Sequence, residues 1–549
     1  MLEDLDLSSI TDERARELVQ RLLNVLEGVM ADLRASQAEN QRLRDEINRL
    51  KGEQGAPAIT PNAPPPPPKN HSSEKERRQP KIWSKDRKMR RIAIDREQVA
   101  PVDPPSLPLD AVFKGYEDVV VQDVIFRTDN VLFHKEKFYS PSQHQTYLAP
   151  LPSGYDGQFG PGIKSLALVF SFGAQMSESK VAELFRNVGV YISDGQVSNL
   201  LIKDQATFHK EKDALYEAGL ASSPWHHLDD TSTRVNGQNG YCHIVCNPLY
   251  TAYFTTATKD RLTIIDVLTN HRPRGFLLNE EALGYVEAFG LSAVRRQQLG
   301  QLPAGTRMDA ATLQTLLEAA VPGLGPQQRK WIMDATAVAA YHAELEFPVV
   351  RLLICDDAPQ FTVVTEELAL CWVHEGRHYK KLVPYVPLHR TLREAFVERF
   401  WTYYHELLAY RDQPTPEEAT RLEREFDALF ATVTGYEALD ERIARTRTKK
   451  GSLLLVLSHP EIPLHNNPAE LGARARVRKR DVSFGPRTRE GAKAWDTFMT
   501  LAETATKLGV SFYHSIHDRV SGLYRLPALA DLIAERAQEL QLRASWNTS

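Results

Sequence analysis

The stretch that decides the fold is residues 225–256, which read WHHLDDTSTRVNGQNGYCHIVCNPLYTAYFTT. The segments WHHLDDTSTRV, YCHIVCN and YTAYFTT are rich in β-branched and aromatic residues, which predicts three successive strands with tight turns. Asp229 and Asp230 fall inside the first strand, although strands disfavour Asp. Because neighbouring strand residues point to opposite faces, a carboxylate pair in mid-strand needs a reason, and a functional site is one.

A later strand adds two more carboxylates. Residues 349–355, VVRLLIC, form an apolar run that predicts a buried strand flanked by helices, and it ends in Asp356 and Asp357. Carboxylates at the C-terminal end of such a strand lie where α/β sheets place their ligand sites.

A predicted helix near the C-terminal end carries a further carboxylate beside a basic cluster. Residues 464–480 read LHNNPAELGARARVRKR, with Asn467 expected as N-cap, Pro468 as first residue and Glu470 as third. Taken alone, Glu470 is better explained as a capping-box residue. Residues 473–489 hold seven basic residues against one acidic residue. A carboxylate beside such a cluster can hold a metal while the arginines hold phosphates.

Together these carboxylates favour a metal site. An Asp on a first strand, an Asp after a later strand and a Glu on a late helix can meet at one edge of a mixed sheet. Three oxygen ligands suit Mg²⁺ or Mn²⁺ better than zinc. Two such ions can bracket a phosphodiester, one activating the attacking oxygen and the other stabilising the leaving oxygen.

Residues 371–381, CWVHEGRHYKK, place Cys371, His374 and His378 on one helical face. Zinc ligation there lacks a visible fourth ligand. The favoured interpretation is a packed cysteine with His374 facing the active site. His374, Arg377 and Lys380 are expected near the scissile phosphate.

Residues 15–51 carry a heptad repeat, which predicts a coiled coil. Eight of its ten seam positions are apolar, and the ten are Val19, Leu22, Leu26, Val29, Leu33, Ser36, Asn40, Leu43, Ile47 and Leu50. Asn40 at an a-type position favours a parallel, in-register dimer. The alternative is packing on the protein's own body. Intermolecular pairing is favoured because an extended proline-rich spacer follows at 61–68.

Two further regions have features of DNA-binding segments. Residues 69–91 hold ten Lys or Arg against three Glu or Asp, which fits either phosphate contact or a solvated tail. Residues 176–201 predict two helices broken near Gly189, with Ser193 and Gln196 as a capping box, either a DNA-reading helix-turn-helix or an ordinary helical hairpin. Its predicted buried seam is Ala182, Leu184, Val188, Val197 and Leu200.

The candidate DNA contacts are the basic and polar residues of these segments and of the 371–381 and 473–489 stretches. They are Arg77, Arg78, Lys81, Lys85, Arg87, Lys88, Arg90, Arg91, Gln196, Asn199, Arg377, Lys380, Arg474, Arg478, Lys479 and Arg480.

Length and composition limit the class of protein. The chain has 549 residues, of which 42% are hydrophobic and 25% charged, close to the globular average. Four cysteines are too few for a disulfide framework, and no signal peptide or membrane-length apolar run is recognisable. A cytoplasmic protein without membrane association is expected. The net charge of −4 averages acidic helical segments and two strongly basic ones.

The motifs HLDDT, LLICDDAPQF, CWVHEGRHYKK, HNNPAELGARARVRKR and GVSFYHSIHDRVSG resemble those of the DDE transposases of bacterial insertion sequences. The nearest class is the large, TnpC-type transposase of insertion-sequence family sixty-six. The resemblance implies an RNase H-like core holding two Mg²⁺ (or Mn²⁺) ions, with Asp229, Asp356 and Glu470 as catalytic metal ligands. Asp230 and Asp357 are second choices, and His374 is auxiliary. It also implies that the partners are element ends and target DNA, which are cleaved and joined through a 3′-hydroxyl.

The chain departs from the family pattern in three ways. No cysteine-rich zinc module follows the spacer, Asp357 replaces a usual Gly, and 127 residues separate Asp229 from Asp356. The long spacing predicts a helical insertion. Two alternatives share the fold: a DNA-binding relative with a vestigial site, and a structure-specific nuclease that cuts without joining.

The expected fold class is multidomain α/β, a mixed-sheet core interrupted by helical insertions behind an N-terminal coiled coil and helix-turn-helix region. The expected units are a dimerising helix (1–52), a spacer and basic segment (53–91), a β-rich module (92–160), a helix-turn-helix region (161–222), three core parts (223–275, 348–382, 461–510), two insertions (276–347, 383–460) and a helical tail (511–549).

Overall fold

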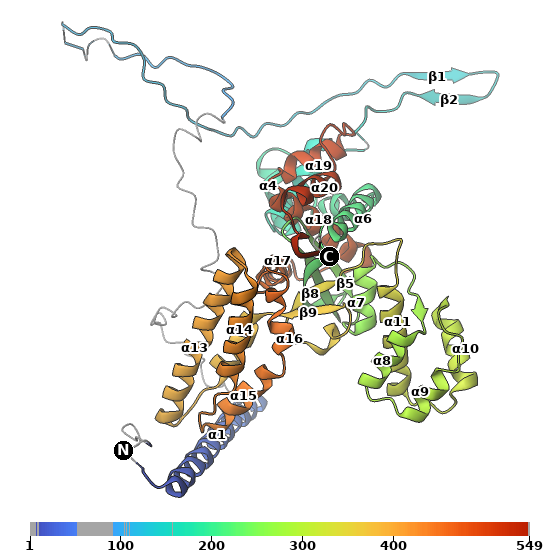
Figure 1. The fold of residues 1–549 in the computed structure, drawn as a ribbon. Coiled ribbons are helices and arrows are strands. Elements are labelled where there is room, and N and C mark those ends of the chain that lie inside the picture. The colour runs from blue at the N-terminus through green and yellow to red at the C-terminus, as the bar shows by residue number, and fades with distance from the viewer. Residues whose placement is uncertain are drawn as a thin grey trace.

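The computed structural model describes residues 7, 10–51, 92–103, 105, 107–108, 110–155 and 157–546. The predicted spacer and basic segment at 53–91 lie outside these residues. Figure 1 shows a central sheet surrounded by helices, a long N-terminal helix and an extended arm.

The central sheet has five strands in the order β5-β4-β3-β8-β9. Its members are β3 (Trp225–Val235), β4 (Gln238–Cys246), β5 (Thr251–Thr256), β8 (Leu352–Cys355) and β9 (Glu367–Leu370). The first three run antiparallel in succession, while β8 is parallel to β3 and β9 is parallel to β8. The predicted mixed α/β architecture and the three successive strands are confirmed.

The turn between β3 and β4 has the geometry that its sequence predicts. Asn236 and Gly237 have φ angles of 51° and 75°. Two consecutive positive φ values match the right-handed twist of a hairpin, and Asn-Gly adopts them at little cost. This turn fixes the register in which Asp229 lies opposite Ile244.

The free edge of β5 is closed by α18 (Arg489–Leu508). Three α18 side chains spaced four apart lie on one helix face and accept hydrogen bonds from alternate β5 N–H groups. These are Asp496 from Thr255 at 2.7 Å, Thr500 from Tyr253 at 3.0 Å and Thr504 from Thr251 at 3.2 Å. Pairing these N–H groups removes a template for strand addition by another chain.

Helices from both ends of the core pack around this sheet. α6 (Ala206–Ala221) contacts α18 and α20 (Leu529–Glu539), and α17 (Asn467–Ser483) contacts β3 and β4. α7 (Arg261–Leu268) follows β5. None of the described helices is both long and apolar enough to cross a membrane.

The predicted helix-turn-helix consists of α4 (Glu178–Asn187) and α5 (Asp194–Ile202), which contact each other. Gly189 turns the chain at φ 87°, and both capping-box bonds between Ser193 and Gln196 are present. The buried seam differs in part from the prediction. Val181, Ala182, Phe185, Val197 and Leu201 are buried, whereas Leu184, Val188 and Leu200 are only half-buried.

Two helical blocks separate the pieces of the sheet in sequence (Figure 1). The first comprises β6 (Phe276–Leu277), α8 (Glu280–Ala288), α9 (Ala293–Leu299), β7 (Arg307–Met308), α10 (Ala310–Ala320) and α11 (Pro326–His342). The second comprises α13 (Pro387–Asp412), α14 (Pro416–Phe430), α15 (Glu437–Arg447) and α16 (Lys450–Leu453). The segments predicted as helical insertions, 276–347 and 383–460, are mostly helical in the structure.

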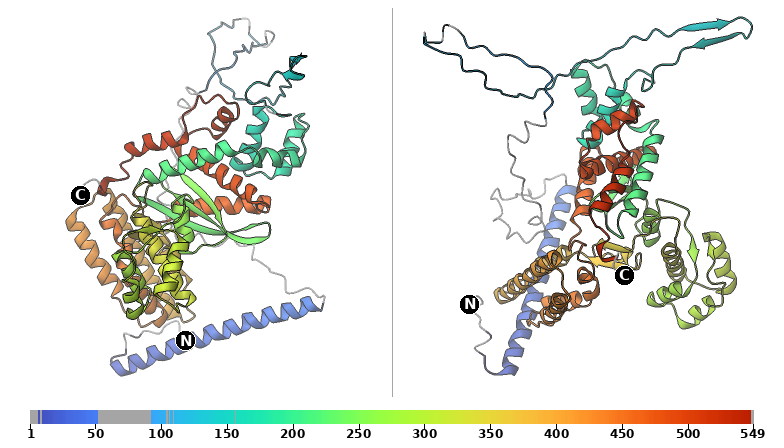
Figure 2. Two further views of the ribbon diagram at one scale, coloured as in Figure 1. Left: turned by 90° about the vertical axis from the view of Figure 1, so that its right-hand side faces the viewer. Right: turned by 45° about the horizontal axis from the view of Figure 1, so that its top comes forward.

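The N-terminal heptad region forms one helix, α1 (Glu13–Leu50), which lies along the second helical block (Figure 2). A face other than the heptad seam contacts the body: Leu23 is buried, and Glu27 accepts hydrogen bonds from the Tyr385 and Val386 N–H groups at 2.6 and 2.9 Å. The seam residues Leu22, Val29, Leu33, Leu43, Ile47 and Leu50 are 49–77% exposed. The helix therefore packs on its own body through the neighbouring face. This contact half-buries the seam residues Val19 and Leu26 and leaves the other six apolar seam residues open.

The β-rich module predicted for 92–160 is reduced to one hairpin. β1 (Lys137–Ser140) pairs with β2 (Gln145–Leu148), but residues 118–125, whose alternating sequence also predicts a strand, have no regular structure. The prediction of that strand is wrong, because among the described residues no strand pairs with this segment. Val121 and Ile125 are 81% and 83% exposed in an arm that extends from the body (Figures 1 and 2).

Candidate active site

Asp229 lies on β3, near the carboxylates of Asp230, Asp356 and Glu470. Its Oδ1 accepts a hydrogen bond from the Asp230 N–H at 2.9 Å. Burial first, and then the charges of Asp356, Glu470 and Asp230, raise the pKa of Asp229 to about 7 against the effect of that hydrogen bond. The structure therefore brings the three sequence-predicted acids within electrostatic reach of one another.

Asp230 is neutralised by partners of its own. Lys259 Nζ lies 3.1 Å from its Oδ1, and Gln360 Nε2 donates to its Oδ2 at 2.9 Å. Both partners were missed in the sequence, where an isolated Lys after a strand and a Gln in a loop carry no signal. Asp230 is thus a paired neighbour at the rim of the cluster.

The structure separates Asp356 from Asp357. Burial raises the pKa of Asp356, the His374 charge opposes this rise and the Asp230 charge adds to it. Asp357 instead forms an ion pair with Lys449 at 2.6 Å, with its side chain 53% exposed. Of the two adjacent acids, Asp356 belongs to the cluster.

Glu470 is not a capping residue. The helix α17 begins one residue earlier than predicted, with Asn466 as N-cap and no side-chain cap bond. The capping-box interpretation is therefore wrong, and the carboxylate is directed to other groups. Arg377 donates to its Oε2 at 3.0 Å, Arg474 lies 3.6 Å from the same atom, and His374 Nδ1 lies 3.6 Å from Oε1.

Asn466 links the segments that carry the acids. Its side chain accepts from His227 Nδ1 at 3.0 Å and donates to the Leu228 carbonyl at 2.8 Å, and its N–H donates to Cys371 Sγ at 3.2 Å. β3, the start of α12 (Trp372–Lys381) and the start of α17 thus meet at one buried amide. The sequence shows Asn466 only as part of an Asn-Asn pair.

The side chains of Cys371, His374 and Glu470 offer ligand atoms that all lie within 4.8 Å of one another. Two of the atoms, His374 Nδ1 and Glu470 Oε1, are buried without a hydrogen-bond partner. An unpaired, buried carboxylate oxygen such as Glu470 Oε1 fits a bound cation. His378, one turn further along α12, is not in this group, so the sequence-based zinc set of Cys371, His374 and His378 is not assembled.

Trp372 fixes α12 to the second helical block. It is fully buried, its indole donates to the Leu453 carbonyl at 2.8 Å, and its ring packs against Phe400, Tyr403 and Phe426. The Cys-Trp pair is therefore explained as core, as the sequence favoured.

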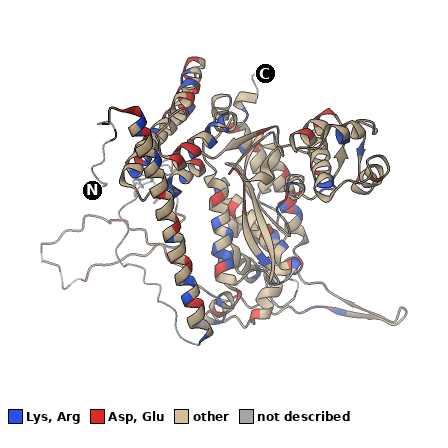
Figure 3. Ribbon diagram, turned by 90° about the horizontal axis from the view of Figure 1, so that it is seen from below, with Lys and Arg blue, Asp and Glu red and all other residues tan. Residues whose placement is uncertain are grey.

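The basic residues of α17 divide into buried and exposed groups. Figure 3 marks the described Lys and Arg residues in blue along the ribbon. Arg474 and Arg478 are exposed, and Arg480 is half-buried with a hydrogen bond to the Ser232 carbonyl. Lys479 is 2% exposed and donates to Ser171 Oγ at 3.0 Å and to the Met176 carbonyl at 2.9 Å. The predicted DNA contact by Lys479 is therefore wrong, because the ammonium is held inside the protein.

Two predicted contacts of the helix-turn-helix also differ in their availability. Gln196 is engaged in the cap and donates to Gln158 at 3.0 Å, whereas Asn199 is exposed. On α12, Lys380 is exposed above the Trp401 ring, and Arg377 is 40% exposed. The basic segment containing Arg77 to Arg91 lies outside the described residues.

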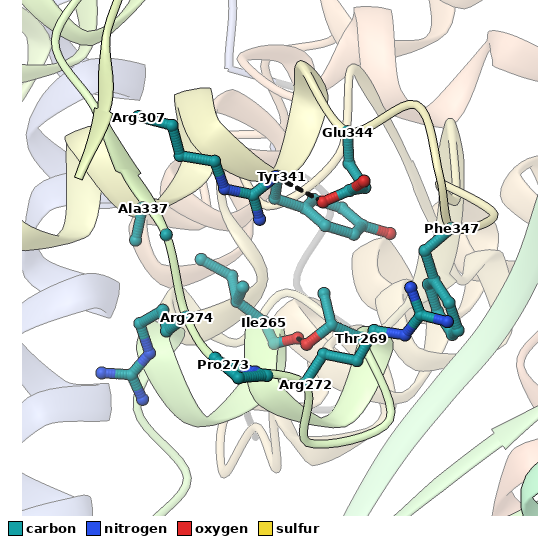
Figure 4. Close-up of a pocket in the computed structure, with 11 residues that line it drawn as sticks. Ile265, Thr269, Arg272, Pro273, Arg274, Arg307, Ala337, Tyr341, Glu344 and Phe347 are labelled. Carbon is teal, nitrogen blue, oxygen red and sulfur yellow. Dashed lines mark hydrogen bonds and ion pairs between the residues drawn. The ribbon is translucent and has the colours of Figure 1, made fainter. Parts of the chain in front are cut away.

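A small pocket lies away from the carboxylates, between α7 and α11 (Figure 4). Arg272, Arg274 and Arg307 line it, but all three are already paired, Arg272 with Glu217 at 3.9 Å. Arg274 bonds to Asp266, and Arg307 forms an ion pair with Glu344 at 2.5 Å. These ion pairs leave little free positive charge for a ligand.

Comparison with known proteins gives the family. A family model described as "Transposase IS66 family" matches residues 156–294 and 350–494, which include all three acids and exclude most of the first helical block. A relative from Sinorhizobium fredii (strain NBRC 101917 / NGR234), named "Uncharacterized protein y4jO", is 32% identical over 339 residues. That alignment covers 59% of this chain and 100% of the relative. With the family model matched over more than half of its length, the chain belongs to the IS66 family of transposases.

Proposed function

We propose that this chain cleaves DNA strands at the ends of an insertion sequence and joins the freed 3′-hydroxyl to target DNA. The observation that carries the proposal is the acid cluster of Asp229, Asp356 and Glu470. It lies within the segments matched by the family model, and burial raises the pKa of two of its members. Buried like charges that gather at one place need a cation to be stable in their ionised forms.

Asp229, Asp356 and Glu470 would hold the divalent ions that this family implies. The unpartnered Glu470 Oε1 and the all-oxygen character of the acids fit Mg²⁺ or Mn²⁺. Bound there, two ions would activate the attacking oxygen and stabilise the leaving oxygen of a phosphodiester.

Basic and polar residues around the three acids would neutralise Asp230 and position the DNA. Lys259 neutralises Asp230, so the negative charge that faces the substrate is concentrated on the three ligands. Exposed Arg474 and Arg478 follow Glu470 on α17 and would bind phosphates beside the reacting bond. Asn199 on α5, and the basic segment at 69–91, would contact DNA further away.

The fold and assembly that we propose follow from the same resemblance. The antiparallel strands β3 to β5, followed by parallel β8 and β9, support an RNase H-like core interrupted by two insertions. The open heptad seam of α1 supports a parallel dimer, because an exposed apolar seam with Asn40 needs a second helix. A dimer would hold two element ends together.

The test is cleavage of a supercoiled plasmid that carries the DNA flanking this gene, with Mg²⁺ present. Asp229→Ala, Asp356→Ala and Glu470→Ala should each abolish nicking and joining. Asp357→Ala is the matched control, since it removes an adjacent acid outside the cluster and should retain activity. Wild-type activity in all three cluster variants would refute the proposal.

The same experiment separates the two alternatives. Cleavage without joined product would identify a nuclease. Absence of both activities, together with no Mn²⁺ binding by the wild-type chain, would identify a DNA-binding relative whose site is vestigial.

A further inference from the structure

Arg377 lies beside the carboxylate of Glu470 and places a positive charge next to it. Its guanidinium donates to Glu470 Oε2 at 3.0 Å and to His374 Nε2 at 3.1 Å. A guanidinium has only donors, so Nε2 of His374 is the acceptor and its proton is on Nδ1. One side chain thus satisfies both the acid of α17 and the histidine of α12.

The same two partners have unsatisfied atoms on their other sides. Glu470 Oε1 and His374 Nδ1 are buried, 3.6 Å apart and without a hydrogen bond. The cluster is therefore half-satisfied: one carboxylate oxygen is paired with the guanidinium and the other is open. A cation that takes the open oxygen will repel the guanidinium a few ångströms away, because like charges at this range are costly in a partly buried site.

The side chain of Arg377 can move away from Glu470 while the backbone of α12 stays in place. Its side chain is 40% exposed, while its helix is fixed on the opposite side. Glu375 is 3% exposed and is held by Arg442, by Thr446 Oγ1 at 2.5 Å and by Lys449 at 3.1 Å. The anchored helix and the free guanidinium make a movable cation on a rigid support.

We propose that Arg377 is a metal-displaced latch: it neutralises Glu470 in the metal-free protein, and a divalent cation that binds Glu470 releases it toward the DNA phosphate. This inference rests on the proposed function, because it takes Glu470 as a metal ligand. It distinguishes Arg377, as a positioning residue, from arginines that only contact DNA, since loss of a latch changes metal affinity when DNA is absent.

The test measures Mn²⁺ binding by calorimetry on the full chain without DNA. Arg377→Gln should bind Mn²⁺ about fivefold more tightly than wild type, the upper end of the range for loss of a competing, partly exposed ion pair. Arg377→Lys, which keeps the charge but cannot bridge two acceptors, should lie in between. In plasmid cleavage, Arg377→Gln should lose activity despite the tighter Mn²⁺ binding.

Arg474→Gln is the matched control. Arg474 lies 3.6 Å from the same Glu470 oxygen but is 60% exposed and makes no hydrogen bond to it. Removing its charge should tighten Mn²⁺ binding by about twofold at most. Equal effects of Arg377→Gln and Arg474→Gln would overturn the latch, because a general change in charge would then explain both.

Failure of the latch and failure of the proposed function give different results. If Arg377→Gln binds Mn²⁺ as wild type does while Glu470→Gln loses binding, the latch is wrong and the metal site stands. If Glu470→Gln and Asp229→Asn both bind Mn²⁺ as wild type does, the acid cluster is not a metal site and both ideas are overturned. Melting curves for each variant show that the protein compared is folded.

Discussion

The carboxylate of Asp229 should destabilise the metal-free protein at neutral and alkaline pH. Burial first, and then the charges of Asp356 and Glu470, raise its pKa from 3.8 to about 7. Asp229→Asn removes the charge but keeps the shape and an oxygen that can accept the Asp230 N–H. In EDTA at pH 8 this variant should therefore be more stable than wild type.

The size of the effect follows from the pKa difference. A rise of about 3 units corresponds to roughly 4 kcal/mol at 1.36 kcal/mol per unit, and partial solvent screening reduces this to about 2–4 kcal/mol. Between pH 3.8 and about 7 the folded state keeps a proton that the unfolded state has lost. Stability from this group therefore falls as pH rises through that window and is constant above it.

The assay is thermal melting of wild type and Asp229→Asn in EDTA at half-unit steps from pH 4.5 to 8.5. The difference in stability should be small at the acid end and reach its full size by pH 8. Asp357→Asn, which removes an exposed acid paired with Lys449, should show no such rise. Parallel curves for wild type and Asp229→Asn across the whole range would refute the reasoning.

Adding Mg²⁺ extends the same experiment. A ligand that binds only the folded state stabilises it by about 2.7 kcal/mol at a hundredfold excess over its dissociation constant. Wild type should gain this stability at pH 8 and Asp229→Asn should not. A gain of equal size in both would mean that Mg²⁺ binds elsewhere.

Four other substitutions test separate parts of the structure. Asn466→Ala should cost about 2–4 kcal/mol in urea unfolding, because it leaves two buried partners on β3 unpaired; a loss below 1 kcal/mol would contradict its linking role. Lys479→Met should leave the salt dependence of DNA binding unchanged, whereas Arg478→Ala should make it shallower, since of the two only Arg478 is exposed. A shallower salt dependence in Lys479→Met, with no change in Arg478→Ala, would mean that Lys479 contacts DNA. Glu27→Ala should speed hydrogen exchange in the first half of α1 without changing the oligomer measured by light scattering, because Glu27 is on the body face; dissociation would put Glu27 in the interface.

The sequence by itself determined the features that depend on near neighbours. The Asn236-Gly237 turn, the Ser193–Gln196 capping box and a helix over the heptad region are all present as expected. Each is fixed by residues within one or two turns of the chain, so its pattern can be recognised without a fold. The family motifs point to Asp229, Asp356 and Glu470 as candidate acids for a related reason, because each of them stands beside its own local signature.

Only the tertiary structure decided between adjacent residues of the same type. Asp356 and Asp357 are adjacent residues of one type. Lys449, at the start of α16, pairs with Asp357, whereas Asp356 lies within electrostatic reach of Asp230 and His374. Arg478 and Lys479 differ by one step on a helix, which turns one to solvent and the other into the core. The role of Asn466 is visible only in the structure, where it is hydrogen-bonded to β3 and to the start of α12. These outcomes depend on partners 90 or more residues away, whose approach is set by packing of the whole core and leaves no local pattern.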